Sequence, residues 1–161
     1  MAELRWRRIG LLLVAFVAAA ALGAPCLGED LSPEEALRRY LSAIQDQRFD
    51  AAYELVSKAM KTDRKTGLVK PKEVWVKESQ YIFAFSEVKI FDFKVGKAQL
   101  EGDEAVVPNL LSSQDKFLNQ LGIDEYELYT LIKEDGGWKI DRQKEVIEAA
   151  EIAKWFPKQP P

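Results

Sequence analysis

The sequence predicts an α+β domain in which helices come first and an antiparallel sheet follows. Residues 32–60 carry strong helix-start signals, and their apolar residues recur at helical spacing. After Glu87 the apolar residues instead alternate with polar ones, which is typical of strands. The sequence Glu-Asp-Gly-Gly at 134–137 separates two strand-like segments and indicates a tight hairpin.

Residues 1–28 have the composition of a secretory signal peptide. Arginines precede an unbroken apolar run over residues 9–22, and small residues with a proline end that run. The run is shorter than the roughly 20 residues that a membrane-spanning helix needs. The sequence therefore predicts export to the bacterial periplasm or cell envelope, with an uncleaved N-terminal anchor as the alternative.

Cys26 is the only cysteine and lies at the end of this segment. It resembles the lipid acceptor of a bacterial lipoprotein signal, although Pro25 stands where such signals usually have a small residue. A lipid on Cys26 and a cysteine lost with the signal are both open interpretations. With one cysteine and no histidine, a disulfide and a Cys- or His-based metal site are excluded. We expect no metal and no cofactor.

The charge balance argues against one class of partner. The whole chain has a net charge of −3, and removal of residues 1–28 would lower it to about −5. A mildly acidic domain has no electrostatic reason to bind nucleic acid. Membrane contact is expected only through the signal segment or a lipid on Cys26. Residues 29–156 fit one domain, and residues 157–161 form a Pro-rich tail that we expect to be disordered.

The first helix has a well-defined start. Ser32 is placed to be its N-cap, Pro33 takes the first helical position, and Glu35 completes a capping box. An apolar face follows at helical spacing. Its residues are Ala36, Leu37, Tyr40, Leu41 and Ile44. The helix is expected to end near residues 46–48.

A second helix is predicted from Asp50, acting as its cap, to Met60. Residues 61–72 are polar and contain Gly67 and Pro71, so we expect a loop. The basic residues of this stretch suit a solvated loop, with a partner or anionic-lipid contact as the alternative. Residues 73–85 suit a helix, although the end of that segment also suits a strand.

Strands are predicted over residues 88–95, 105–107, 126–132 and from 138 to 140. Pro108 lacks a backbone donor, so its strand is expected to be an edge there or to carry a bulge.

The segments between and after the strands are predicted as follows. Residues 112–122 are interpreted as an excursion with helical character around Phe117 and Leu121. A final helix is predicted over residues 143–156, with apolar residues at helical spacing.

This order of elements resembles the nuclear transport factor 2-like superfamily, which includes ketosteroid isomerases, polyketide-cyclase-like proteins and many exported domains of unknown function. The segments that carry the resemblance are SPEEAL…RFDAAYELVS, within residues 32–57, and LIKEDGGWKID at 131–141. The resemblance implies a cystatin-like cone, in which a curved antiparallel sheet wraps the helices and leaves a pocket at its open end. It also implies that a homodimer through the outer sheet face is possible. The predicted final helix is an addition that could plug or cover the cone.

Enzymes of this superfamily use Asp, Tyr or His as acids and bases in an apolar cavity, and this chain has no His. Asp92 interrupts an apolar run, and simple alternation puts it on the face of Val88 and Ile90, opposite Phe91 and Phe93. Inside the cone it would be a weak candidate base with a raised pKa. Facing water, which is the simpler interpretation, it is an ordinary surface residue. No catalytic motif of the isomerases maps onto this chain.

Aromatic residues are the candidate lining of a ligand pocket, since such sites are largely apolar with a few polar points. Their alternative role is to fill the core. The candidates are Tyr40, Trp75, Phe83, Phe91, Tyr129 and Trp138. We therefore expect a non-catalytic module that binds a small apolar ligand or a protein partner. The alternatives are a metal-free isomerase, cyclase or dehydratase, and a structural protein whose cone is filled by its own side chains.

Overall fold

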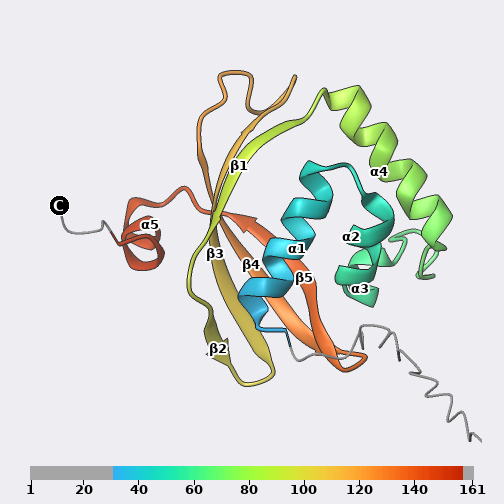
Figure 1. The fold of residues 1–161 in the computed structure, drawn as a ribbon, viewed down its shortest axis with the longest axis horizontal. Helices are drawn as coiled ribbons and strands as arrows, with labels where there is room; N and C mark the ends of the chain where they lie inside the picture. Colours follow the sequence, from blue (N-terminus) through green and yellow to red (C-terminus); the bar gives the residue numbers. More distant parts are fainter. Residues whose placement is uncertain (1–30, 158–161) are drawn as a thin grey trace, which may run out of the picture.

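The computed structural model describes residues 31–157 (Figure 1). The predicted signal peptide, Cys26 and residues 158–161 of the predicted tail lie outside the described residues. The elements are α1 Pro33–Gln45, α2 Phe49–Leu55, α3 Lys58–Lys61, α4 Lys72–Ser86, β1 Lys89–Val95, β2 Gln99–Glu101, β3 Glu104–Gln114, β4 Glu125–Glu134, β5 Gly137–Glu145 and α5 Ala149–Trp155. The α+β class and the order of helices before the sheet are confirmed. Within 31–157, no helix is long and apolar enough to cross a membrane.

The first helix begins as the sequence predicts. The Ser32 hydroxyl accepts a hydrogen bond from the Glu35 amide at 3.2 Å, and Pro33 stands in the first turn. The helix buries Leu37 and Leu41 almost completely. They form the main core with apolar residues of the sheet and with Val56. These buried residues are Ala36, Leu37, Leu41, Val56, Ala105, Val107, Tyr129, Leu131 and Ile140.

The predicted second helix is split into two, which corrects the sequence-based boundary. Val56 is extended and forms a parallel bridge with Ile140, so the backbone of α2 stops there. Ser57 then caps α3 by accepting from the Met60 amide at 3.2 Å, and its hydroxyl donates to Asp141 at 2.8 Å. Asp50 is a first-turn residue of α2 rather than its cap. Pairing with β5 therefore outweighs local helix propensity at this joint.

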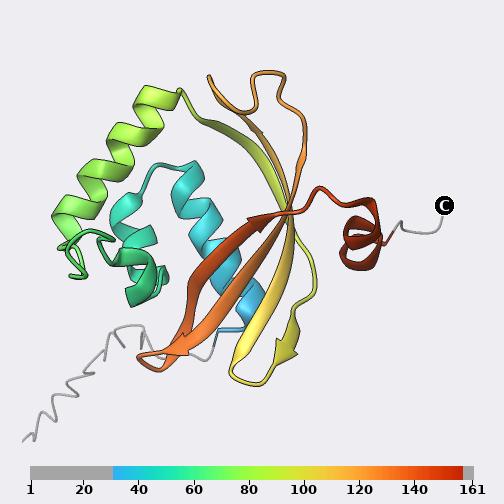
Figure 2. The same cartoon turned by 180° about the vertical axis from the view of Figure 1, so that it is seen from behind.

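The five strands form one antiparallel sheet in the order β1-β3-β4-β5, with β2 also paired to β3. The sheet curves around α1, and we call the face that packs on α1 the concave face (Figures 1 and 2). The 134–137 hairpin is confirmed, with Asp135 and Gly136 both at positive φ. Helix α4 lies farther out, on the same side of the sheet as α1.

Strand β1 carries a bulge that the sequence did not reveal. The register shifts between Ile90 and Asp92, so Ile90 pairs with Ser113 whereas Asp92 pairs with Ser112. The side-chain amide of Gln45, at the end of α1, donates to the carbonyls of Ile90 and Phe91 at 3.3 and 3.2 Å. The bulge thus reverses the alternation of faces for the rest of the strand.

Pro108 lies in β3, which is a central strand, and its missing donor is accommodated by a break in the neighbouring chain. Strand β1 ends opposite Asn109 and β2 begins opposite Val106, so Pro108 faces the segment between them. The Gly96 amide donates to the Pro108 carbonyl at 2.8 Å. A Cβ atom on Gly96 would lie 2.8 Å from Cγ of Pro108. Glycine therefore allows this close approach.

Two helical predictions were wrong, namely the bounds of the final helix and the helical character of the 112–122 excursion. The final helix does not start at residue 143, because β5 continues to Glu145 and only Ala149–Trp155 is helical. The first residues of the predicted helix pair with β4 instead, as Gln143 does with Tyr129. Helix α5 lies on the outer face of the sheet, where Phe156 stacks edge-on against Tyr126 with ring centroids 4.8 Å apart. It therefore neither plugs nor covers the cone.

The excursion over residues 115–124 is a braced loop without a helix. The Asp115 carboxylate accepts from the amides of Phe117, Leu118 and Asn119. These local hydrogen bonds compete with helix formation, which is a common behaviour of aspartate.

Candidate ligand-binding cavity

A cavity of about 270 Å³ lies between α1, α4 and the concave face of the sheet. Four of the six predicted aromatic residues line it, namely Tyr40, Trp75, Phe83 and Tyr129. The other lining residues come from α1, α2, α4, the segment before β1, and strands β1, β3 and β5. They are Leu41, Ile44, Phe49, Ser79, Ile82, Val88, Ile90, Leu111, Ser113 and Gln143. The described residues that line the cavity include no charged side chain.

Aromatic rings are packed edge-to-face around this cavity. Phe49 and Phe83 have ring centroids 4.9 Å apart at 72°, and Tyr40 and Tyr129 have centroids 6.4 Å apart at 64°. The ring centroids of Trp75 and Tyr53 are 5.7 Å apart, and Tyr53 does not itself line the cavity. Edge-to-face pairs are a favoured arrangement of aromatic side chains. The rings are thus fixed by neighbours on α1, α2 and β4.

Helix α4 is the outer wall of the cavity, and none of its residues is fully buried. Ile82 shows the consequence, since it lines the cavity while 57% of its surface is exposed. On the far side of α4, Tyr81 stacks on Phe85, which in turn stacks on Phe117 of the 115–124 loop. The wall is therefore held at its C-terminal end by aromatic contacts rather than by a buried core.

One end of the cavity is polar and leads to a buried carboxylate. Ser113, Tyr129 and Gln143 line the cavity on the sheet side, which we call its polar end because each donates to a glutamate of β4. The Tyr129 hydroxyl donates to Glu127 at 3.2 Å and the Gln143 amide donates to its other oxygen. Asn109 donates to Glu127 from the neighbouring strand at 2.8 Å. Only 3% of Glu127 is exposed, and its three hydrogen-bond donors are all neutral.

Burial dominates the electrostatics of this cluster. Loss of hydration raises the pKa of Glu127, although its three hydrogen bonds act in the opposite direction. Burial and the nearby Glu127 carboxylate raise the pKa of Tyr40 to about 12 and place that of Tyr129 well above its usual value. Both phenols are therefore neutral at physiological pH.

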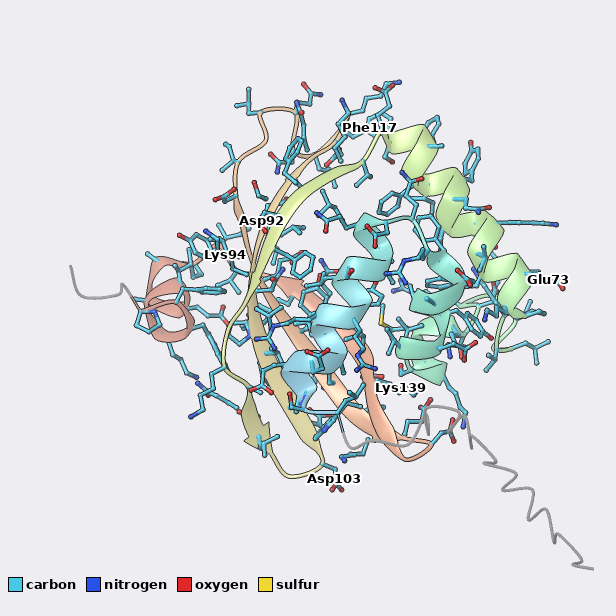
Figure 3. All side chains as sticks on the ribbon, viewed as in Figure 1. Glu73, Asp92, Lys94, Asp103, Phe117 and Lys139 are labelled. Atoms are coloured by element: carbon cyan, nitrogen blue, oxygen red, sulfur yellow. The ribbon has the colours of Figure 1, made fainter. Side chains whose placement is uncertain are left out.

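The remaining predicted site residues lie away from the cavity. The bulge in β1 leaves Phe91 unpaired and half-exposed. Trp138 packs against the main core, with Lys133 Nζ 5.0 Å from its ring centroid. Asp92 is exposed on the sheet face away from α1, next to Lys94 (Figure 3). It borders a separate, smaller depression of about 110 Å³ with Ser112 and Asp124 among its neighbours.

Sequence reasoning missed Glu127 as a site residue, although a signal was present. Glu127 alternates with Tyr129 and Leu131 along β4, so it shares their face. A carboxylate in phase with two buried residues predicts burial. The signal was masked because Tyr126, Leu128 and Thr130 on the other face also have high strand propensity. Among residues 31–157 no group of acidic side chains could hold a metal ion.

Among protein-family models and curated protein sequences, nothing matches this chain. Solved structures do match its fold. A candidate ketosteroid isomerase from Shewanella frigidimarina is 16% identical with a TM-score of 0.50, over 71% of this chain and 95% of that one.

Two other similar structures are described by fold rather than by activity. A nuclear transport factor 2-like protein from Cytophaga hutchinsonii is 15% identical (TM-score 0.48) over 69% of this chain and 91% of that one. A domain of unknown function with a cystatin-like fold from Nostoc punctiforme is 13% identical (TM-score 0.48) over 72% and 76%. The chain spans only 38% of another match, Bd1075 of Bdellovibrio bacteriovorus. The chain therefore shares the α+β fold of the candidate ketosteroid isomerase, and an identity this low establishes the fold alone.

Proposed function

We propose that the mature domain is an exported, non-catalytic module that binds a small apolar ligand in the cavity between α1, α4 and the sheet. The observation that carries the proposal is a cavity lined mainly by apolar and aromatic side chains, with a few polar groups, most of them on the sheet. Small-molecule sites have this composition, because apolar surface supplies affinity and a few polar groups fix orientation.

The size of the cavity limits the ligand. An apolar cavity of about 150 Å³ accommodates benzene, and drug-sized ligands occupy roughly 300–1,000 Å³. A cavity of about 270 Å³ lies between these values and suits a substituted ring or a short branched hydrocarbon. An open volume of this size also argues against a cone filled entirely by its own side chains.

A metal-free acid–base enzyme is the second candidate, and the observation that favours it is Glu127. A buried carboxyl with a raised pKa beside Tyr129 is a combination that acid–base enzymes use. Glu127 lies behind Tyr129 and Gln143, which line the cavity, whereas catalysis would require Glu127 or a relayed proton to reach the substrate. This requirement makes the binding role the better supported one.

The proposal is tested by native mass spectrometry of the protein isolated gently from the envelope fraction of its host. We expect a retained small molecule. Ser79→Trp fills the cavity from α4 and should abolish retention, whereas Gln80→Trp places the same ring on an exposed neighbouring position and should not. A bare protein in every preparation, or equal retention by both variants, would overturn the binding role.

A homodimer through the outer sheet face is a separate part of the proposal. Helix α5 lies over part of this face, with Phe156 against Tyr126 and Lys144 paired to Glu151 at 2.8 Å. A dimer would therefore have to form beside α5 or include it. Light scattering during size exclusion gives the mass of the particle, and a monomer across micromolar concentrations would contradict this part.

A further inference from the structure

We infer that the cavity selects an organic ammonium ion, a ligand with an apolar body and a positively charged head. The inference rests on the proposed function, because it assumes that the cavity is a ligand site. It deepens that function by assigning the ligand's charge from the groups around the cavity.

The first argument is the density of aromatic rings around a small volume. Tyr40, Phe49, Trp75, Phe83 and Tyr129 all line the cavity. The face of an aromatic ring carries partial negative charge and attracts a cation, and the attraction is stronger when the cation is desolvated. Several rings around one ammonium group form the aromatic cage known from quaternary-ammonium recognition.

The second argument is the sign of the nearby charge. No lysine or arginine of residues 31–157 lines the cavity. Behind its polar end lie two carboxylates, Glu127 and Glu125, and Ser113 Oγ donates to Glu125 at 3.0 Å. A positive ligand head would be attracted by buried Glu127 and, with more screening by water, by half-buried Glu125, and a negative one would be repelled.

The third argument is that three donors of the cavity wall are already engaged by carboxylates. Tyr129, Gln143 and Ser113 all line the cavity, yet each directs a donor away from it to a glutamate. In the same cluster Asn109 Oδ1 is buried without a hydrogen-bond partner, the only such side-chain atom within residues 31–157. With these three donors engaged by carboxylates, fewer are left for an anionic head, which favours a cationic ligand over an anionic one.

Three probes of matched shape test the charge preference. They are benzyltrimethylammonium, its neutral carbon isostere neopentylbenzene, and the anion benzylsulfonate. Binding to the mature protein isolated from cells is followed by calorimetry and by tryptophan fluorescence, to which Trp75 in the cavity wall contributes together with Trp138 and Trp155. We expect the cation to bind at least as tightly as the more apolar neutral isostere, and benzylsulfonate to bind at least tenfold more weakly than the cation.

Two variants identify the source of the preference. Glu127→Gln keeps the side-chain size and removes the charge, so the affinity for benzyltrimethylammonium should fall about tenfold while that for neopentylbenzene stays constant. Glu101→Gln makes the same change on exposed β2 and should alter neither value. Trp75→Leu, on exposed helix α4, keeps Glu127 and should weaken the cation more than the neutral probe. Trp75→Leu tests the charge preference by itself if Glu127→Gln does not fold.

The outcomes distinguish failure of the charge preference from failure of the proposed ligand site. Tighter binding of neopentylbenzene than of the cation, with the same ratio in Glu127→Gln, overturns the charge preference and leaves the proposed apolar site standing. Equal binding of benzylsulfonate and the cation also overturns it. If none of the three probes binds, the charge preference fails, and native mass spectrometry decides separately whether the proposed function fails with it.

Discussion

Asn109 and Glu127 face each other across β3 and β4, and the Asn109 amide donates to the Glu127 carboxylate at 2.8 Å inside the sheet. Both side chains are buried, so this is a polar pair within an otherwise apolar layer. Buried polar groups are costly unless they are hydrogen-bonded, and the hydrogen bond between these two offsets part of that cost. The pair connects the main core to the polar end of the cavity.

The stability of the protein should depend on pH through Glu127. Burial raises the pKa of its carboxyl above the ordinary value of 4.5, so the folded state binds the proton more tightly than the unfolded chain. This contribution is fully present below the ordinary value and is lost as the pH rises through the folded pKa. Urea denaturation between pH 4.5 and 8 should show stability falling by at most about 1.4 kcal/mol per pH unit from this group.

Glu127→Gln should remove that pH-dependent part, because glutamine does not ionise. The difference in the free energy of unfolding between the wild type and the variant should therefore change with pH in favour of the variant as the pH rises. A difference that stays constant over the whole range would contradict the assignment of the titration to Glu127.

Removal of the Asn109 amide should destabilise the fold. Asn109→Ala leaves the buried carboxylate without one of its donors, and we expect a loss of about 2–3 kcal/mol in the free energy of unfolding at pH 7. Calorimetric or denaturant unfolding measures this loss. In the double variant with Glu127→Gln the cost should be smaller, since an amide at 127 carries no charge. Strict additivity of the two changes would show that the pair does not interact.

The close approach of Gly96 to Pro108 should make Gly96 sensitive to substitution. A Cβ atom there would lie 2.8 Å from the proline ring, so Gly96→Ala should cost about 1–3 kcal/mol. Gly137→Ala is the matched control, because a methyl group at that position would meet nothing within 4 Å and the φ of Gly137 is not positive. Thermal unfolding of the two variants compares them directly. Equal melting temperatures would contradict the steric argument.

Export and lipidation are separable by variants in the signal region. If Cys26 carries a lipid, metabolic labelling with a fatty acid should mark the wild type and leave Cys26→Ala unlabelled. The variant should then move from the membrane to the soluble envelope fraction. Labelling that is absent from both proteins, with an unchanged envelope location, would exclude the lipid, and the mass of the isolated protein would then separate a cleaved signal from an uncleaved anchor. A cytoplasmic location of the wild type would contradict export.

Local signals were sufficient where one interaction dominates a segment. The capping of α1 by Ser32 and Pro33 and the hairpin at 134–137 depend on nearest neighbours along the chain, and both formed as predicted. Strand β4 formed where it was predicted, because residues 126–132 have high strand propensity. The aromatic residues Tyr40 and Tyr129 were placed together through the overall cone, which the resemblance implied.

Local signals failed where distant segments decide the outcome. Residues 143–145 have helical spacing, yet they pair with β4 because the hydrogen bonds of an existing strand outweigh helix propensity. Val56 leaves the helix because Ile140 offers a bridge. In β1 a single bulge, held by Gln45 from α1, turned Asp92 away from the cavity. None of these partners lies within a window that periodicity can examine.

The sequence by itself determined the class of fold, the order of the elements, the start of α1 and the hairpin, because capping, turn chemistry and apolar period act over a few residues. Only the tertiary structure decided which carboxylate is buried. Glu127 and Asp92 both stand in apolar strands, but their burial depends on strand register and on the helix that covers each face. Register is a long-range property, since a shift of one residue exchanges the two faces of a strand.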